Sequence, residues 1–72
     1  MHTNTANYGS LIKGLRLQRN MSLYDLSKLA GISASYLHLL ETGSRDNPTI
    51  GIVIKLNKIL GISMLEVENF FI

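Results

Sequence analysis

Two short helical patterns hinged on one glycine constrain the fold of this chain more than any other feature. Residues 23–40 read LYDLSKLAGISASYLHLL, and apolar residues recur at helical spacing on both sides of Gly31. The recurring positions are Leu26, Leu29 and Ala30 before the hinge, and Leu37 and Leu40 after it, where the charged Glu41 follows directly. Gly31 can adopt the left-handed conformation that ends a helix, which would cost a residue with a Cβ roughly 1 kcal/mol or more. The stretch therefore predicts a helix, a tight turn and a second helix.

The residues around the hinge suit such a turn. Ser33 can cap the second helix with its hydroxyl. Ile32 is apolar because a turn this short points its side chain inward, and Ser27 is small because it lies where two steeply crossing helices would touch. Together these residues specify a helix-turn-helix motif at about residues 22–41.

The chain before and after this motif also has helical signals. Residues 1–7 are polar and without period, and we expect a flexible N-terminal arm there. Residues 8–19 show apolar helical spacing and predict a helix with a weak point at Gly14. Ser22 and Asp25 resemble a capping box at the start of the next helix, and residues 42–47, TGSRDN, predict a surface loop.

Two more helices are predicted after the loop. Pro48 and Thr49 can start a fourth helix that Gly61 closes, with Asn57 facing inward as a satisfied polar group of the core. Ser63 and Glu66 form a capping-box pattern, which predicts a fifth helix over residues 64–70. The sequence thus predicts an all-α protein, a compact five-helix bundle whose single domain spans residues 8–72.

Composition argues against several classes of protein. A chain of 72 residues is one domain, at the size where a single core is barely sufficient. It has no cysteine, two distant histidines and no paired catalytic carboxylates, so we expect no disulfide, no metal or other cofactor and no enzyme activity. No apolar run approaches the roughly 20 residues of a membrane span, and residues 1–4 do not start a signal peptide. We therefore expect a cytoplasmic protein without membrane contact.

The charge is unevenly distributed along the chain. Acids prevail from residue 46 onward, whereas bases prevail before it. The charged residues of the first part are Lys13, Arg16, Arg19, Lys28 and Arg45 against Asp25 and Glu41. A basic half that coincides with the helix-turn-helix fits a polyanion partner, although such an excess is also common on ordinary protein surfaces.

Five motifs arrive in the order seen in one family. They read IKGLRLQRNMS, LSKLAGISASYL, LETG, NPTI and LGIS. The chain resembles, over about residues 9–68, the Cro and phage-repressor type (XRE) of helix-turn-helix domain, and most of all the SinR-type repressors. This resemblance implies a lambda-repressor-like DNA-binding domain that binds operator DNA as a dimer, with the helix after Gly31 in the major groove.

The resemblance also implies which residues meet DNA. Base contacts fall on Ala34, Ser35, His38 and Leu39, and Ala34 could meet a thymine methyl group. Phosphate contacts fall near Leu23 and in the loop after the recognition helix. The full set of expected DNA-binding residues is Ser22, Lys28, Ser33, Ala34, Ser35, Tyr36, His38, Leu39, Thr42, Ser44, Arg45 and Asn47. For each of them the alternative is an ordinary solvated surface residue.

Two further structural features are expected. The helical period places Leu23, Leu39, Ile52 and Ile59 away from the core stripe. The apolar residues near the C-terminal end predict a homodimer interface, with plain core as the alternative; they are Ile52, Ile59, Val67, Phe70 and Phe71. The resemblance also implies an ion pair of Arg16 with Glu41, with two unrelated surface charges as the alternative. In such a pair the planar guanidinium could hold the carboxylate through two bonds and cap carbonyls at the end of the recognition helix.

The function predicted from these observations is a sequence-specific DNA-binding transcriptional regulator. We expect a repressor that binds double-stranded operator half-sites as a homodimer. The alternative is a protein-interaction module, which binds a regulatory protein partner and has weak or no DNA readout. Leu23, Leu39 and the lack of any Lys or Arg in residues 33–41 favour that alternative.

Overall fold

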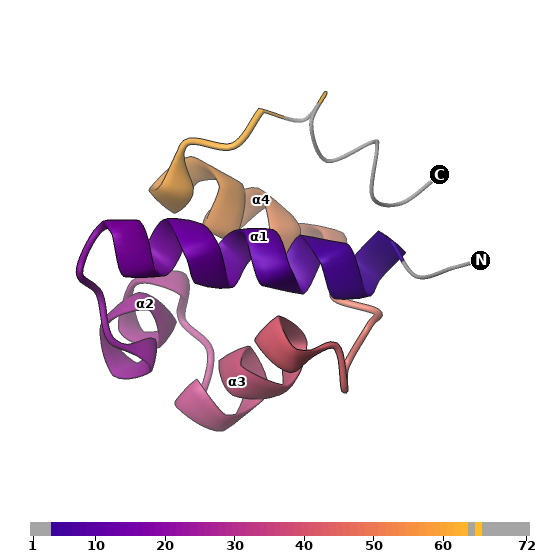
Figure 1. Cartoon of the computed structure of the whole chain (residues 1–72), viewed down its shortest axis with the longest axis horizontal. Helices are drawn as coiled ribbons and strands as arrows, with labels where there is room; N and C mark the ends of the chain where they lie inside the picture. The colour runs from indigo at the N-terminus through magenta and orange to yellow at the C-terminus, as the bar shows by residue number, and fades with distance from the viewer. Residues whose placement is uncertain (1–3, 64, 66–72) are drawn as a thin grey trace.

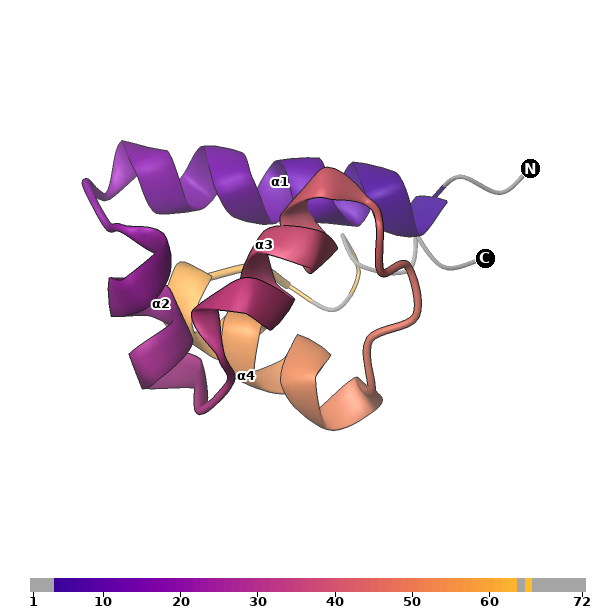
Figure 2. The ribbon, with the colours of Figure 1, turned by 90° about the horizontal axis from the view of Figure 1, so that it is seen from below.

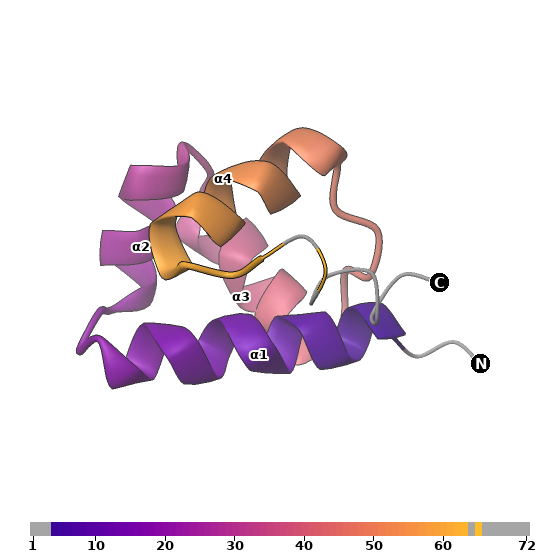
Figure 3. The ribbon, with the colours of Figure 1, turned by 90° about the horizontal axis from the view of Figure 1, so that it is seen from above.

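Four helices form the described part of the chain. A computed structural model describes residues 4–63 and 65, with side chains from Tyr8 onward. The helices are α1 (Asn4–Gln18), α2 (Leu23–Ala30), α3 (Ala34–Thr42) and α4 (Ile50–Leu60), and no strand occurs in this part of the chain. The long helix α1 runs along the molecule and packs on α3 and α4 (Figure 1). α3 lies in front when the molecule is seen from below, and α4 when it is seen from above, so these helices occupy opposite sides (Figures 2 and 3).

The all-α class is confirmed, but two boundaries differ from the prediction. The predicted fifth helix, residues 64–70, lies outside the described residues except for Leu65. The first helix begins at Asn4 rather than at Tyr8, so residues 4–7 are helical and not part of an arm. Polar composition suggested an arm, yet neither proline nor glycine interrupts residues 4–8, and a first helical turn can form without apolar side chains.

The predicted caps on both sides of the hinge are present. The Ser22 hydroxyl accepts a hydrogen bond from the Asp25 N–H at 2.9 Å, while the Ser22 N–H donates to the Asp25 carboxylate at 3.0 Å. Gly31 ends α2 with a φ of 71°, the left-handed conformation that glycine adopts without strain. Ser33 then accepts the Tyr36 N–H at 3.0 Å and caps α3. These local bonds fix the helix-turn-helix where the sequence predicts it.

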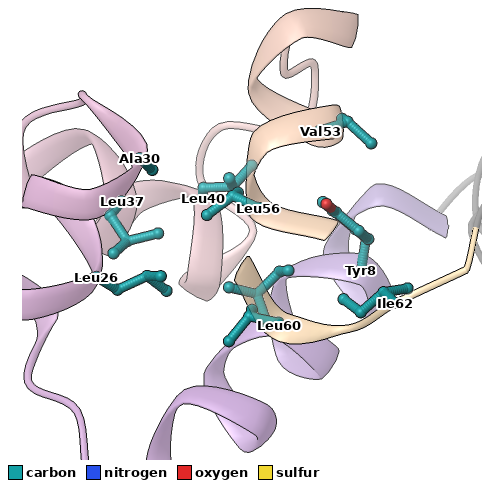
Figure 4. Packing of buried hydrophobic residues seen from close by; sticks show 10 residues of the cluster. Tyr8, Leu26, Ala30, Leu37, Leu40, Val53, Leu56, Leu60 and Ile62 are labelled. Carbon is teal, nitrogen blue, oxygen red and sulfur yellow. The ribbon is translucent and has the colours of Figure 1, made fainter. Parts of the chain in front are cut away.

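One core joins all four helices. Figure 4 shows side chains from each helix meeting between α1, α3 and α4. The buried apolar residues are Tyr8, Ile12, Leu26, Ala30, Leu37, Leu40, Val53, Leu56, Leu60 and Ile62. Inside this core the Tyr8 hydroxyl donates to Asn57 Oδ1 at 2.9 Å, so Asn57 is a satisfied core residue as predicted. Burial raises the pKa of Tyr8 above its ordinary value.

Several apolar residues lie elsewhere than predicted. Leu29 is 63% exposed, because Leu26 and Ala30 already occupy the inward positions one turn apart and the residue between them rotates outward. Leu23, Ile52 and Ile59 are half-buried and pack against the core, although the helical period placed them away from it. Neighbouring helices approach α2 and α4 from more than one direction, so the buried stripe is wider than the period suggests.

A close helix crossing was not predicted. Gly9 of α1 is buried where α1 meets the end of α3, and a Cβ at this position would overlap the backbone oxygen of Leu40. Glycine therefore lets the two backbones approach closely. In the sequence, Gly9 and Gly14 look alike, yet a Cβ at Gly14 would meet nothing within 4 Å.

Candidate nucleic-acid interface

The outer face of α3 is the centre of the candidate site. α3 lies in front in Figure 2, between α2 and the loop over residues 43–49. Leu37, Leu40 and Glu41 point into the molecule, so the opposite positions Ser35 and His38 are exposed. Exposure of the remaining predicted base-reading positions is smaller: Ala34, Tyr36 and Leu39 are half-buried. The Tyr36 side chain also packs against the core.

The start of α2 supplies the second part of this surface. Ser22 is exposed, but its hydroxyl and N–H are both engaged in the capping box. The backbone N–H of Ser22, and then its hydroxyl, hold the pKa of the Asp25 carboxyl below its ordinary value. Lys28 is also exposed, and its ammonium lies 5.3 Å from the ring centroid of Tyr24. This contact, one helical turn apart, is a cation–π interaction that sequence reasoning did not single out.

The loop after α3 is tied to the end of that helix. Gly43 has a φ of 86° and turns the chain. The Arg45 N–H donates to the Leu39 oxygen at 3.1 Å, and the Thr42 hydroxyl lies 3.2 Å from the hydroxyl of Ser44. Thr42 and Ser44 thus hold the loop in shape, whereas the side chains of Arg45 and Asn47 are exposed. The structure therefore places a cation next to the C-terminal end of α3.

An internal network connects both halves of the motif to α1. Arg16 Nε donates to Glu41 Oε2 at 2.8 Å and Nη2 donates to Oε1 at 3.0 Å, with only 6% and 5% of the two residues exposed. The third nitrogen, Nη1, donates to the Met21 oxygen at 2.7 Å. The prediction that Arg16 caps carbonyls at the end of the recognition helix was wrong, because this carbonyl lies before α2. The bonds to Glu41 raise the pKa of Arg16 above its ordinary value.

The basic excess of the sequence does not lie on the helix-turn-helix elements. Arg16 is neutralised internally by Glu41, and the exposed charges of residues 22–49 are two cations, Lys28 and Arg45, and two anions, Asp25 and Asp46. These four charges cancel. The other exposed cations of the described residues belong to α1, its C-terminal turn and α4; they are Lys13, Arg19, Lys55 and Lys58.

Two of those cations lie beside helix C-termini. Gly31 ends α2, and a Cβ built on it would be 3.5 Å from Lys55 Nζ. Gly61 ends α4, and a Cβ built on it would be 3.6 Å from Arg19 Nη2. Positive charge at a helix C-terminus is favourable because the last carbonyls carry partial negative charge. Lys55 and Arg19 therefore have a structural reason for their positions.

The described residues show neither a cluster of metal ligands nor a helix suited to cross a membrane. Between residues 4 and 65, no three His, Asp or Glu side chains gather where they could hold a metal ion. Among the described helices, none has both the length and the apolar character that crossing a membrane requires. The dimer residues Val67, Phe70 and Phe71 lie outside the described part of the chain.

A capped helix, a left-handed glycine and a second capped helix with an exposed outer face define a helix-turn-helix protein. A family model described as helix-turn-helix matches residues 12–67, and the chain belongs to this family. This confirms the resemblance to XRE-type domains.

Two curated relatives are named HTH-type transcriptional regulator SinR. The one from Bacillus licheniformis is 34% identical over 61 residues, which are 85% of this chain and 55% of the relative. The one from Bacillus subtilis (strain 168) is 34% identical over 56 residues, which are 78% of this chain and 50% of the relative. The chain thus spans about half the length of these relatives. No solved structure matches it.

Proposed function

We propose that this chain binds DNA as a transcriptional regulator, with α3 in the major groove. The exposed outer face of α3, flanked by the start of α2 and by the Arg45 loop, is the observation that carries this proposal. Phosphate contacts from the two flanks set the register, and α3 side chains such as Ser35 and His38 select the bases. The names of the two SinR relatives support regulation of transcription.

A repressor acting as a homodimer is the specific form that we propose. Two-fold symmetry requires two half-sites separated by one helical turn of DNA or a multiple of it. The half-buried Ile52 and Ile59 of α4 contribute to the interface, together with Val67, Phe70 and Phe71. Sedimentation of the intact chain and of a chain ending at Glu68 tests this interface. Two monomeric species at micromolar concentration, with and without DNA, would rule out the dimer.

DNA binding is tested by selecting a site from random double-stranded DNA and measuring its affinity over a series of salt concentrations. Arg45→Ala should weaken binding to all sequences and reduce the slope of log K against log salt by about one. Lys58→Ala is the matched control, because Lys58 is an exposed cation on α4, at the opposite side of the molecule from α3. Equal effects of the two variants would contradict the assigned surface.

A protein-interaction module remains the second candidate function. The cancelling charges of residues 22–49 favour it, as does the exposed apolar surface of Tyr24 and Leu29 on α2. Such a module would show a flat salt dependence with DNA and no preferred sequence.

A further inference from the structure

His38 is the one residue of α3 that can bring a positive charge to the proposed DNA surface. The helix contains neither Lys nor Arg, and Glu41, its single acidic residue, is buried in the pair with Arg16. Permanent cations, which supply most of the attraction between proteins and DNA, are therefore missing from the element at the centre of the site.

The side chain of His38 lies on the outer face of α3. It is exposed and, among the described residues, has no hydrogen bond or ion pair that would fix it in one form. Histidine is the side chain that ordinarily gains or loses its charge between pH 5 and 8. Since the other exposed charges of residues 22–49 cancel, protonation of His38 gives this stretch a net positive charge.

The other charged groups around α3 are not imidazoles. Four parts of the chain surround α3: α1 with the turn after it, α2, α4 and the loop after α3. Their charged groups and exposed tyrosine are Lys13, Arg16, Arg19, Tyr24, Asp25, Lys28, Arg45, Asp46, Lys55 and Lys58. Lysine, arginine and carboxylate groups ordinarily titrate well outside pH 6–8. Hydrogen bonds lower the pKa of Asp25 further, and those to Glu41 raise the pKa of Arg16. Among the described residues, His38 is therefore the single imidazole at this surface.

We infer that DNA binding by this chain is coupled to protonation of His38, so that affinity rises as the pH falls from 8 to 6. This inference rests on the proposed DNA-binding function. A DNA phosphate or a base acceptor near α3 favours the charged imidazole. An opposite charge within about 4–6 Å of an imidazole favours its charged form by about tenfold or more, so the protonated chain should bind DNA about tenfold more tightly than the neutral one. The neutral imidazole still offers one donor and one acceptor, but it adds no charge attraction.

The test measures the affinity for the selected DNA site at pH 6, 7 and 8 at constant ionic strength. The wild-type chain should bind about tenfold more tightly at pH 6 than at pH 8. His38→Gln keeps a hydrogen-bonding side chain without a titratable charge, and its affinity should change much less over this range. His38→Lys carries a permanent charge and should bind tightly at all three values.

Two other groups need a control, because His2 and the α-amino group also titrate in this range. His2→Gln should follow the wild-type pH dependence, and His38→Gln keeps both of these groups. Circular dichroism at each pH checks that all the variants are folded. Equal pH dependence of wild type and His38→Gln would overturn the inference while DNA binding itself stands. Absence of binding by every variant at every pH would instead overturn the proposed function.

Discussion

Gly9 of α1 lies so close to the backbone oxygen of Leu40 in α3 that a Cβ on the glycine would overlap it. This contact sets the distance between α1 and the end of α3. The Arg16–Glu41 pair connects the same two helices about two turns further along α1. A glycine and an ion pair thus determine together how α3 is held.

Gly9→Ala should lower the free energy of unfolding by roughly 2–4 kcal/mol, because the clash is with backbone and the helices must separate. Gly14→Ala is the matched control. Gly14 lies in the same helix and is exposed, and a Cβ there would have nothing within 4 Å, so the substitution should raise the free energy of unfolding by about 0.5–1 kcal/mol. Urea denaturation measures both. Stabilisation by Gly9→Ala would show that the helices can separate at no cost.

Glu41→Leu alone should lower the free energy of unfolding by about 3 kcal/mol, since it leaves the buried guanidinium of Arg16 without its carboxylate. Arg16→Met alone should have a similar cost. The double variant should cost much less than the sum, because two apolar side chains can pack together. A double-mutant cycle by urea denaturation gives the coupling energy, and additive costs would mean that the pair adds nothing.

Ser35→Ala should weaken binding to the selected DNA site by roughly 1 kcal/mol and leave the melting temperature unchanged, because Ser35 is exposed on the outer face of α3. Leu40→Ala should cost about 2–5 kcal/mol of stability, because Leu40 is fully buried. Affinity and thermal melts of both variants are needed. A similar loss of stability in the two variants would show that the faces of α3 are assigned wrongly.

Asp25 should make the fold lose stability in acid. Its pKa is lowered in the folded chain by the bonds with Ser22, so its contribution is present above the ordinary carboxyl pKa of the unfolded chain and is lost as pH falls through the lower folded value. The melting temperature of Asp25→Asn should therefore fall less than that of wild type between about pH 5 and pH 2, where carboxyl groups titrate. Asp46→Asn is the control, because Asp46 is exposed and has no hydrogen bond among the described residues. Identical profiles for wild type and Asp25→Asn would contradict a role for the capping box.

Local signals predicted the motif well. Ser22, Gly31 and Ser33 act through bonds to residues at most four positions away, and such bonds depend little on the rest of the fold. The inward-facing Asn57 also follows from the helical period alone.

The features that the sequence did not predict depend on contacts between distant segments. The role of Gly9 arises only where α1 crosses α3, and the Met21 carbonyl reaches Arg16 because the chain turns back after α1. Likewise, only the structure shows that Arg16 is paired with Glu41 inside the molecule, so that its charge does not add to the exposed charges around α3. The position of Lys55 beside Gly31, at the end of α2, also depends on the fold.

The three bonds of Arg16 have a consequence for how the domain opens. They join α1 to Met21, which precedes the N-cap of α2, and to the last turn of α3. If the α2 half of the motif detached alone, the almost fully buried Arg16 guanidinium would lose the Met21 oxygen as an acceptor. If α3 detached alone, it would lose the Glu41 carboxylate. Partial unfolding of α3 is therefore suppressed, and the described helices should exchange their core amide protons as one cooperative unit.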